Sequence, residues 1–188
     1  MLRVVNKKRK VTNRRDLGQR NRRLLLESLE DRRLLSTIEW DGGPSGTGTD
    51  WSDPVNWIGD VLPGPDDDVQ IDVVANVTVV HASGSDSIKS LHSTNALNLS
   101  GGTLTVAGTV QVDNTFPVSG GTLAGATVQP GAHGEGMVIT SGTLDGVMAN
   151  ANLDLTNNAT ATITHGLTLN GTLSVGSATD TSAKGYVN

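Results

Sequence analysis

Short runs of alternating aliphatic and polar residues recur along the chain between residues 69 and 175. Gly, Asn and Ser, which favour turns, separate these runs. In an extended strand this two-residue period places the aliphatic side chains on one face and Thr, Asn and Ser on the other. The pattern therefore predicts many short, half-buried strands. The alternating positions are Val69-x-Ile71-x-Val73, Val77-x-Val79-x-His81, Leu97-x-Leu99, Leu104-x-Val106, Val110-x-Val112, Leu153-x-Leu155, Ala161-x-Ile163, Leu167-x-Leu169 and Leu173-x-Val175.

A Gly-Thr-Leu marker adds a longer period to this pattern. It occurs at 102–104, 121–123, 142–144 and 171–173, so the first two intervals are similar and the third is longer. A period of about 20 residues is typical of solenoids, and a coil of that length made of short strands is one rung of a parallel β-helix. The longer third interval predicts either an insertion near residues 145–160 or a rung that has lost its marker.

The marker spacing therefore predicts an all-β fold, a single-stranded parallel β-helix. At about 20 residues per rung, residues 37–188 would form roughly seven rungs. A two-sheet sandwich of short strands is the alternative, but a sandwich does not require a fixed period.

Residues 37–80 carry all three tryptophans of the chain. This segment resembles the opening segment of bacterial β-helical surface proteins with autotransporter-associated strand repeats. The resemblance implies a cap on the first rung, and a solenoid needs one because its end exposes apolar side chains and strand edges. We therefore expect Trp40 and Trp57 to be buried, and a sugar-stacking platform of indole rings is the alternative. The shared residues are Trp40, Gly42, Trp51, Ser52, Asp53, Pro54, Asn56, Trp57, Pro63, Gly64, Asp67, Asp68 and Val69.

Composition supports this architecture and excludes other classes of protein. Aromatic residues make up 3% of the chain, and there are 23 glycines. Such a composition argues against a helical bundle, and a narrow β-coil has little room for aromatic rings. The absence of Cys excludes disulfide scaffolds, thiolate zinc sites and cysteine nucleophiles. No apolar run is long enough for a transmembrane helix.

Charge divides the chain at residue 36. Residues 1–36 hold twelve basic and four acidic residues, a net charge of +8, whereas residues 37–188 hold two basic and fifteen acidic residues, a net charge of −13. We expect the tail to be disordered or partly helical and dispensable for folding. Nucleic-acid or membrane-surface binding by the tail is one interpretation, but we expect no nucleic-acid partner because nothing in the body resembles a nucleic-acid reader.

The stretch LESLEDRRLLS at residues 26–36 resembles the LExLEDRxLLS motif near the N-terminus of large exported and cell-surface proteins of planctomycete bacteria. The resemblance implies a basic export or processing tail over residues 1–36, followed by an extracellular or cell-surface body. That body would consist of the Trp-containing cap with the first strands (residues 37–80) and the β-helix repeats (residues 81–188).

No constellation of catalytic residues stands out in the body. A polysaccharide lyase needs a basic residue to abstract a proton, but the body holds only Lys89 and Lys184, and its charge would repel a polyanion. A glycosidase needs two close carboxylates, and Asp113, Asp145 and Asp154 form no obvious pair. We therefore predict no catalytic residue and no cofactor.

Metal-binding patterns are equally weak. The four histidines have no spacing typical of metal ligands, so we expect them to be solvated or in turns; they are His81, His92, His133 and His165. The carboxylates of Asp66, Asp67 and Asp68 could bind calcium, but consecutive strand residues point in opposite directions. A solvated turn before the next strand is the favoured interpretation, and no metal site is predicted.

These observations predict a non-catalytic structural or adhesion segment outside the cell or at its surface. Extracellular polysaccharide or cell-envelope components are the candidate partners, and a carbohydrate-active β-helix, or a fragment of one, is the alternative. The sequence after Val175 is polar, with Tyr186 its one aromatic residue. We therefore expect an open end, belonging either to a piece of a longer repeat protein or to a unit that associates end to end.

Overall fold

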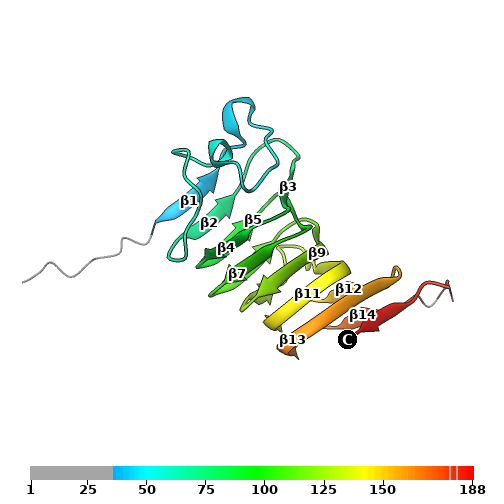
Figure 1. Cartoon of the computed structure of the whole chain (residues 1–188). Coiled ribbons are helices and arrows are strands. Elements are labelled where there is room, and N and C mark those ends of the chain that lie inside the picture. Colours follow the sequence, from blue (N-terminus) through cyan, green and yellow to red (C-terminus); the bar gives the residue numbers. More distant parts are fainter. Residues whose placement is uncertain (1–35, 178, 181) are drawn as a thin grey trace, which may run out of the picture. The chain divides into compact units, whose positions relative to one another are not determined.

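A computed structural model describes residues 36–177, 179–180 and 182–188 of the chain (Figure 1). Strands account for 52% of it and helices for 4%, and the parallel strands stack into a β-solenoid of about five turns. The predicted β-helix is thus confirmed. The predictions for the tail, including its dispensability and the LESLEDRRLLS motif, fall on residues 1–36, which lie outside the described residues except for Ser36.

Each turn of the solenoid contributes a strand to each of three faces. The first face stacks β1 (Thr37–Trp40), β2 (Asp68–Ile71), β5 (Ser90–Ser93), β8 (Thr109–Val112), β10 (Thr127–Gln129) and the last residues of β11 (Met137–Ala149) and β13 (Ala159–Leu169). The second stacks β3 (Thr78–His81), β6 (Ala96–Leu99), the first residues of β9 (Phe116–Ala124) and β11, then β12 (Leu153–Leu155) and β14 (Leu173–Val175). The third stacks β4 (Ser85–Ile88), β7 (Thr103–Val106), later residues of β9 and β11, the first residues of β13, and β15 (Gly185–Val187).

The predicted count of roughly seven rungs is approximate. Five regular turns, starting with β2, β3 and β4, each place a strand on all three faces. The last rung also has a strand on each face, but residues 176–184 separate β14 from β15. Ahead of these turns lies β1 alone, which is followed by the cap.

The unequal marker spacing comes from a lost marker. Gly142, Thr143 and Leu144 pair with Ala161, Thr162 and Ile163 of the next turn, so this turn repeats the first marker interval without the motif. Gly171-Thr172-Leu173 lies at another corner of the coil, because Leu173 pairs with Leu153 on the second face. The predicted insertion near residues 145–160 is therefore wrong, and the lost-marker interpretation is confirmed.

Glycine is required at Gly121 and Gly142 because neighbouring turns approach closely there. A Cβ at Gly142 would lie 2.6 Å from Cγ1 of Val118 and 2.7 Å from the carbonyl oxygen of Gly121, at a φ of +144°. A Cβ at Gly121 would lie 2.6 Å from Cγ of Leu99. Only a residue without a side chain fits both the space and the backbone conformation of Gly142.

The inward side chains form continuous columns along the stack. One column on the first face runs through Val69, Leu91, Val110, Val128 and Ala149, each at most 3% exposed. Burying one such Val or Leu side chain stabilises the fold by about 1.5–3 kcal/mol relative to leaving it in water. The alternating pattern of the sequence therefore supplies the core directly.

The cap closes the N-terminal end of the stack through its tryptophans. Trp40 stacks in register on Ile71, and the Trp57 ring meets the Trp40 and Trp51 rings edge-on, each at a centroid distance of 4.8 Å. The indole N–H of Trp57 donates to the carbonyl oxygen of Trp51 (2.9 Å). All three rings are at most 3% exposed, so the predicted burial is confirmed.

Two short 3-10 helices shape the loop of the cap. They are η1 (Gly43–Ser45) and η2 (Pro54–Asn56). The carboxylate of Asp53 accepts the backbone N–H of Val55 (3.1 Å) and so caps η2. Within the described residues, no helix has the length and apolar character needed to cross a bilayer.

Candidate functional site

The tryptophans cannot serve as a sugar-binding platform. A platform needs an exposed ring face, whereas Trp51 and Trp57 are 0% exposed and Trp40 is 3% exposed. Their faces pack against one another and against the core. The sequence-based alternative of a stacking site is therefore wrong.

His81 is a core residue at the junction between cap and stack. It lies at the end of β3, is 0% exposed, and packs 5.8 Å from the Trp51 ring. Its Nδ1 hydrogen-bonds to the carbonyl oxygen of Gly101 (2.8 Å) and its Nε2 to the carboxylate of Asp86 (2.8 Å). The expectation of a solvated histidine is wrong here, because alternation along β3 points His81 inward after Val79.

The other three histidines lie at the surface, as predicted, and each contacts a carboxylate. Nε2 of His92 lies 3.0 Å from Asp113, and Nδ1 of His133 lies 3.2 Å from Glu135. His165 contacts Asp145. The pairs of His92 and His165 each join residues about one rung apart in the sequence.

Other polar side chains also contact partners one turn away. The Lys89 ammonium donates to Asp68 (2.7 Å), and Asn170 donates to Asn150 (2.8 Å), which donates to Gln129 (3.3 Å). Sequence reasoning missed these pairs because it compared histidines only with one another. These pairs could have been found by looking for a His, Lys or Asn that lies about 20 residues, the length of one rung, from an acidic or amide residue.

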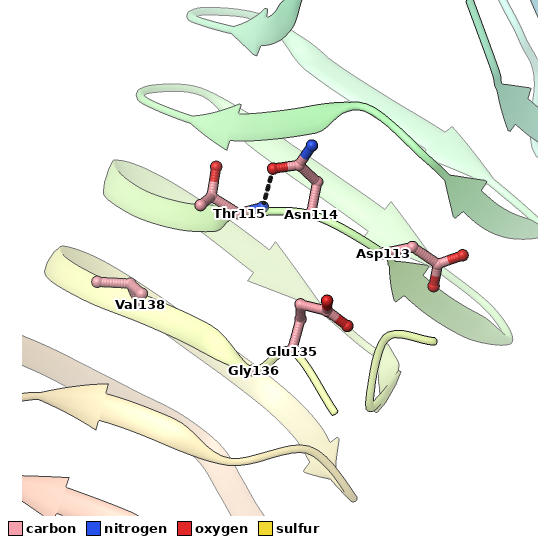
Figure 2. A pocket seen from close by; sticks show the side chains of 6 residues that line it. All are labelled: Asp113, Asn114, Thr115, Glu135, Gly136 and Val138. Atoms are coloured by element: carbon pink, nitrogen blue, oxygen red, sulfur yellow. Dashed lines mark hydrogen bonds between the residues drawn. The ribbon is translucent and has the colours of Figure 1, made fainter. Parts of the chain in front are cut away.

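A pocket of about 420 Å³ is a candidate binding site on the described surface (Figure 2). Asp113 and Glu135 approach it from neighbouring turns, together with Asn114 and Thr115. The backbone N–H of Ala132 donates to Asp113 (2.8 Å), which fixes the loop that carries Glu135. The remaining lining residues are Gly136 and Val138.

Both carboxylates of the pocket favour the ionised form. Burial raises the pKa of Asp113, but hydrogen bonds from Gln111, His92 and the Ala132 N–H together bring that pKa below its ordinary value. The pKa of Glu135 is also lowered, because its carboxylate accepts the backbone N–H groups of Glu135 and His133. The pocket can therefore accept hydrogen bonds or attract a cation.

The same ionisation argues against glycoside hydrolysis. A glycosidase needs one carboxyl group with a raised pKa, so that it can protonate the leaving oxygen at neutral pH. Asp113 and Glu135 both shift in the opposite direction. Asp145 lies on the third face and contacts His165, whereas the pocket lies at the corner between the first and second faces. Asp154 accepts the backbone N–H of Thr156 (2.9 Å).

The acidic run at the start of β2 is used in local and inter-turn contacts. Asp67 accepts the backbone N–H of Gly64 (2.7 Å) and also contacts Ser36. Asp68 pairs with Lys89, and this hydrogen bond together with one from Ser90 lowers the pKa of Asp68. Within the described part of the chain, no group of three or more His, Asp and Glu side chains is arranged to hold a metal ion.

Comparisons with protein-family models, with curated proteins and with solved structures give no match to this chain.

Proposed function

We propose that this chain is a non-catalytic structural or adhesion segment, exported to the outside of the cell and displayed at its surface. The observation that carries the proposal is the use of the outward side chains. His92–Asp113, Lys89–Asp68 and Asn170–Asn150 connect one turn to the next, which reinforces a rod rather than building a reaction centre. A rigid, acidic, repeat-built surface suits spacing and contact roles outside a cell.

The proposed extracellular localisation rests on the LESLEDRRLLS stretch and on the change in the sign of the net charge at residue 36. The test is to produce the full chain with a C-terminal epitope in a planctomycete host and to label intact cells with an antibody that cannot enter them. We expect surface labelling. A variant with Glu27, Asp31 and Arg32 changed to Ala is the matched control and should stay inside. Retention of the unaltered chain in the cytosol would contradict the proposal.

A second candidate function is carbohydrate binding at the pocket of Asp113 and Glu135. The supporting observation is a concave site that combines two ionised carboxylates with an amide and a hydroxyl group, which suits sugar hydroxyl groups. The ligand would be neutral or cationic, because the body carries a net charge of −13.

Calorimetric titration with neutral, amine-bearing and uronate oligosaccharides tests this second function. We expect binding of the first or second class, lost in Glu135→Gln and retained in Asp145→Asn. Asp145 is the matched control because it is a histidine-paired carboxylate outside the pocket. Equal losses in both variants, or binding of the uronate polymer alone, would contradict a site at this pocket.

A further inference from the structure

Two interior columns of the solenoid start with polar side chains in the first regular turn. His81 is the first residue of a column on the second face, and Asp86 is the first residue of a column on the third face. In the next two turns these columns continue with aliphatic residues that are 0% exposed, namely Leu99 and Val118 after His81, and Leu104 and Leu123 after Asp86. A polar pair therefore occupies two positions that the repeat otherwise fills with aliphatic side chains.

Both ring nitrogens of His81 face oxygen atoms that accept hydrogen bonds. Nδ1 lies 2.8 Å from the carbonyl oxygen of Gly101, and Nε2 lies 2.8 Å from a carboxylate oxygen of Asp86. A neutral imidazole carries one N–H group, so it can donate to only one of these oxygens. Its other nitrogen would then place a lone pair against the second oxygen. An imidazolium ion carries an N–H group on each nitrogen and donates to both oxygens.

One carboxylate balances the charge that an imidazolium ion carries at this position. The Asp86 side chain is 23% exposed, so it accepts from His81 while it keeps contact with water. From the cap, the uncharged Trp51 ring lies 5.8 Å from the imidazole. The neighbouring Asp50 is exposed, and its carboxylate accepts the backbone N–H of Ser52 (2.9 Å). The next turn presents a backbone carbonyl oxygen and aliphatic side chains to the pair.

The cap is attached to the stack at the residue before His81. The backbone N–H of Trp51 donates to the carbonyl oxygen of Val80 (3.0 Å), and the N–H of Val80 donates to the carbonyl oxygen of Thr49 (2.7 Å). In the next turn, the backbone N–H of Gly101 donates to the carbonyl oxygen of His81 (3.1 Å). His81 therefore lies where the cap and the first two regular turns meet, so a change in its side-chain contacts acts on this junction.

We infer that Asp86 and Gly101 hold His81 as an imidazolium ion, and that its proton fastens the cap to the first regular turn. The junction is then a pH-sensitive element of the fold. Loss of the proton breaks the hydrogen bond to one of the two oxygens and leaves a lone pair facing that oxygen in the core. Aliphatic residues would fill the two positions without this sensitivity, because a buried ion pair is often no more stabilising than apolar side chains of similar volume. The inference depends on neither export nor a ligand.

Nitrogen chemical shifts of the histidine rings are the first test. The full chain is labelled with nitrogen-15 in its histidines, and the His81 signals are those absent from the double variant His81→Leu/Asp86→Leu. We expect both ring nitrogens of His81 to be protonated at about pH 7, with N–H protons that exchange slowly with water because the side chain is 0% exposed. His92, His133 and His165 are the internal comparison, since their side chains are 40%, 84% and 83% exposed. A neutral ring at His81 at this pH would overturn the inference.

The pH dependence of stability is the second test. The folded chain holds the His81 proton and the unfolded chain releases it as the pH rises, so the free energy of unfolding should fall between about pH 6 and pH 9. The double variant restores aliphatic residues to both columns and should lose most of this decline. His165→Gln is the matched control because it removes a histidine–carboxylate pair at the surface, and it should keep the decline. A decline that persists in the double variant, or that disappears equally in the control, would contradict the inference.

Tryptophan fluorescence locates the effect, because all three tryptophans of the chain lie in the cap segment. We expect acrylamide to quench this fluorescence more strongly at about pH 9 than at about pH 6, since a loosened cap admits the quencher. The double variant should show equal quenching at the two pH values. Backbone circular dichroism should stay unchanged, because the aliphatic columns of the later turns hold the stack together. Quenching of the unaltered chain that does not change with pH would show that the proton does not fasten the cap.

Discussion

The two ends of the described solenoid differ in how their apolar columns are covered. At the first end Trp40 stacks on Ile71, and three indole rings cover the columns. At the last rung Val175 and Val187 are each 48% exposed. At the first end, large side chains from outside the repeat therefore cover the columns, whereas strand pairing alone leaves the side chains of the last described rung exposed.

The largest expected effect is on the capped end. Trp57→Ala removes a ring that is 0% exposed and that contacts both other indole rings. We expect a loss of about 3–5 kcal/mol in the free energy of unfolding, measured with urea. Tyr186→Ala, at a residue 51% exposed in the last rung, is the comparison and should change the unfolding midpoint little. Equal losses would mean that the two ends are equally closed.

A pair of glycine substitutions tests how rigid the last described rung is compared with the middle of the stack. A Cβ at Gly142, in the middle of the stack, would lie 2.6 Å from Val118, and a Cβ at Gly185, in the last rung, would lie 2.3 Å from the carbonyl oxygen of Leu155. Gly142→Ala should cost about 1–3 kcal/mol because turns on both sides hold the corner in place. Gly185→Ala should cost less despite its closer approach, because the last rung can shift outward. A larger loss for Gly185→Ala would argue that the last rung is held as firmly as the middle.

Two histidine–carboxylate pairs extend the comparison to polar groups. Asp86→Ala leaves Nε2 of the fully buried His81 without its partner, so we expect a loss of about 1–3 kcal/mol in the free energy of unfolding. Asp145→Ala leaves a histidine side chain that is 83% exposed and can bind water instead. Thermal unfolding of this second variant should match that of the unaltered chain. Similar destabilisation of the two variants would show that burial does not set the strength of these pairs.

The smallest expected effect is on acid sensitivity. The pKa of Asp68 is lowered by hydrogen bonds from Lys89 and Ser90, and the pKa of Asp180 is lowered by hydrogen bonds from Ser182. A lowered folded-state pKa stabilises the fold above the unfolded value of 3.8 and loses this contribution as the pH falls through the folded-state pKa. Asp68→Asn should therefore flatten the decline in stability below about pH 4.

Asp180→Asn is the comparison in the last described rung. It should leave the acid decline of global unfolding unchanged, because the contacts of Asp180 lie within residues 177–183 and the last rung can open locally. Urea titrations between pH 3 and pH 7 measure both slopes. If only Asp180→Asn flattened the decline in stability at low pH, the contacts of Asp180 would contribute to global stability and those of Asp68 would not.

Much of this fold could be predicted from the sequence because the inward or outward direction of a strand residue depends on its position among its immediate neighbours in the chain. Alternation identified the inward residues of most strands, including Leu104, Val110 and Leu153, which are at most 1% exposed. Alternation also identified Ala161-x-Ile163 as a strand, but only the pairing showed that it takes the place of the marker in its turn. The pocket could not be predicted, because Asp113 and Glu135 belong to different turns and meet only after the loop before β11 is folded back.

The sequence by itself determined which side chains point inward, where the corners lie and that tryptophans would cover one end. A two-residue period, a tight corner and a large apolar ring each act over a few residues, so these features are readable in order along the chain. Only the tertiary structure decided which outward residues meet. The turn that joins Val69 to its core partner Leu91 is longer than the turn that joins Val110 to Val128, because the corners differ in length. Partners such as His92 and Asp113 therefore depend on the accumulated length of every corner between them.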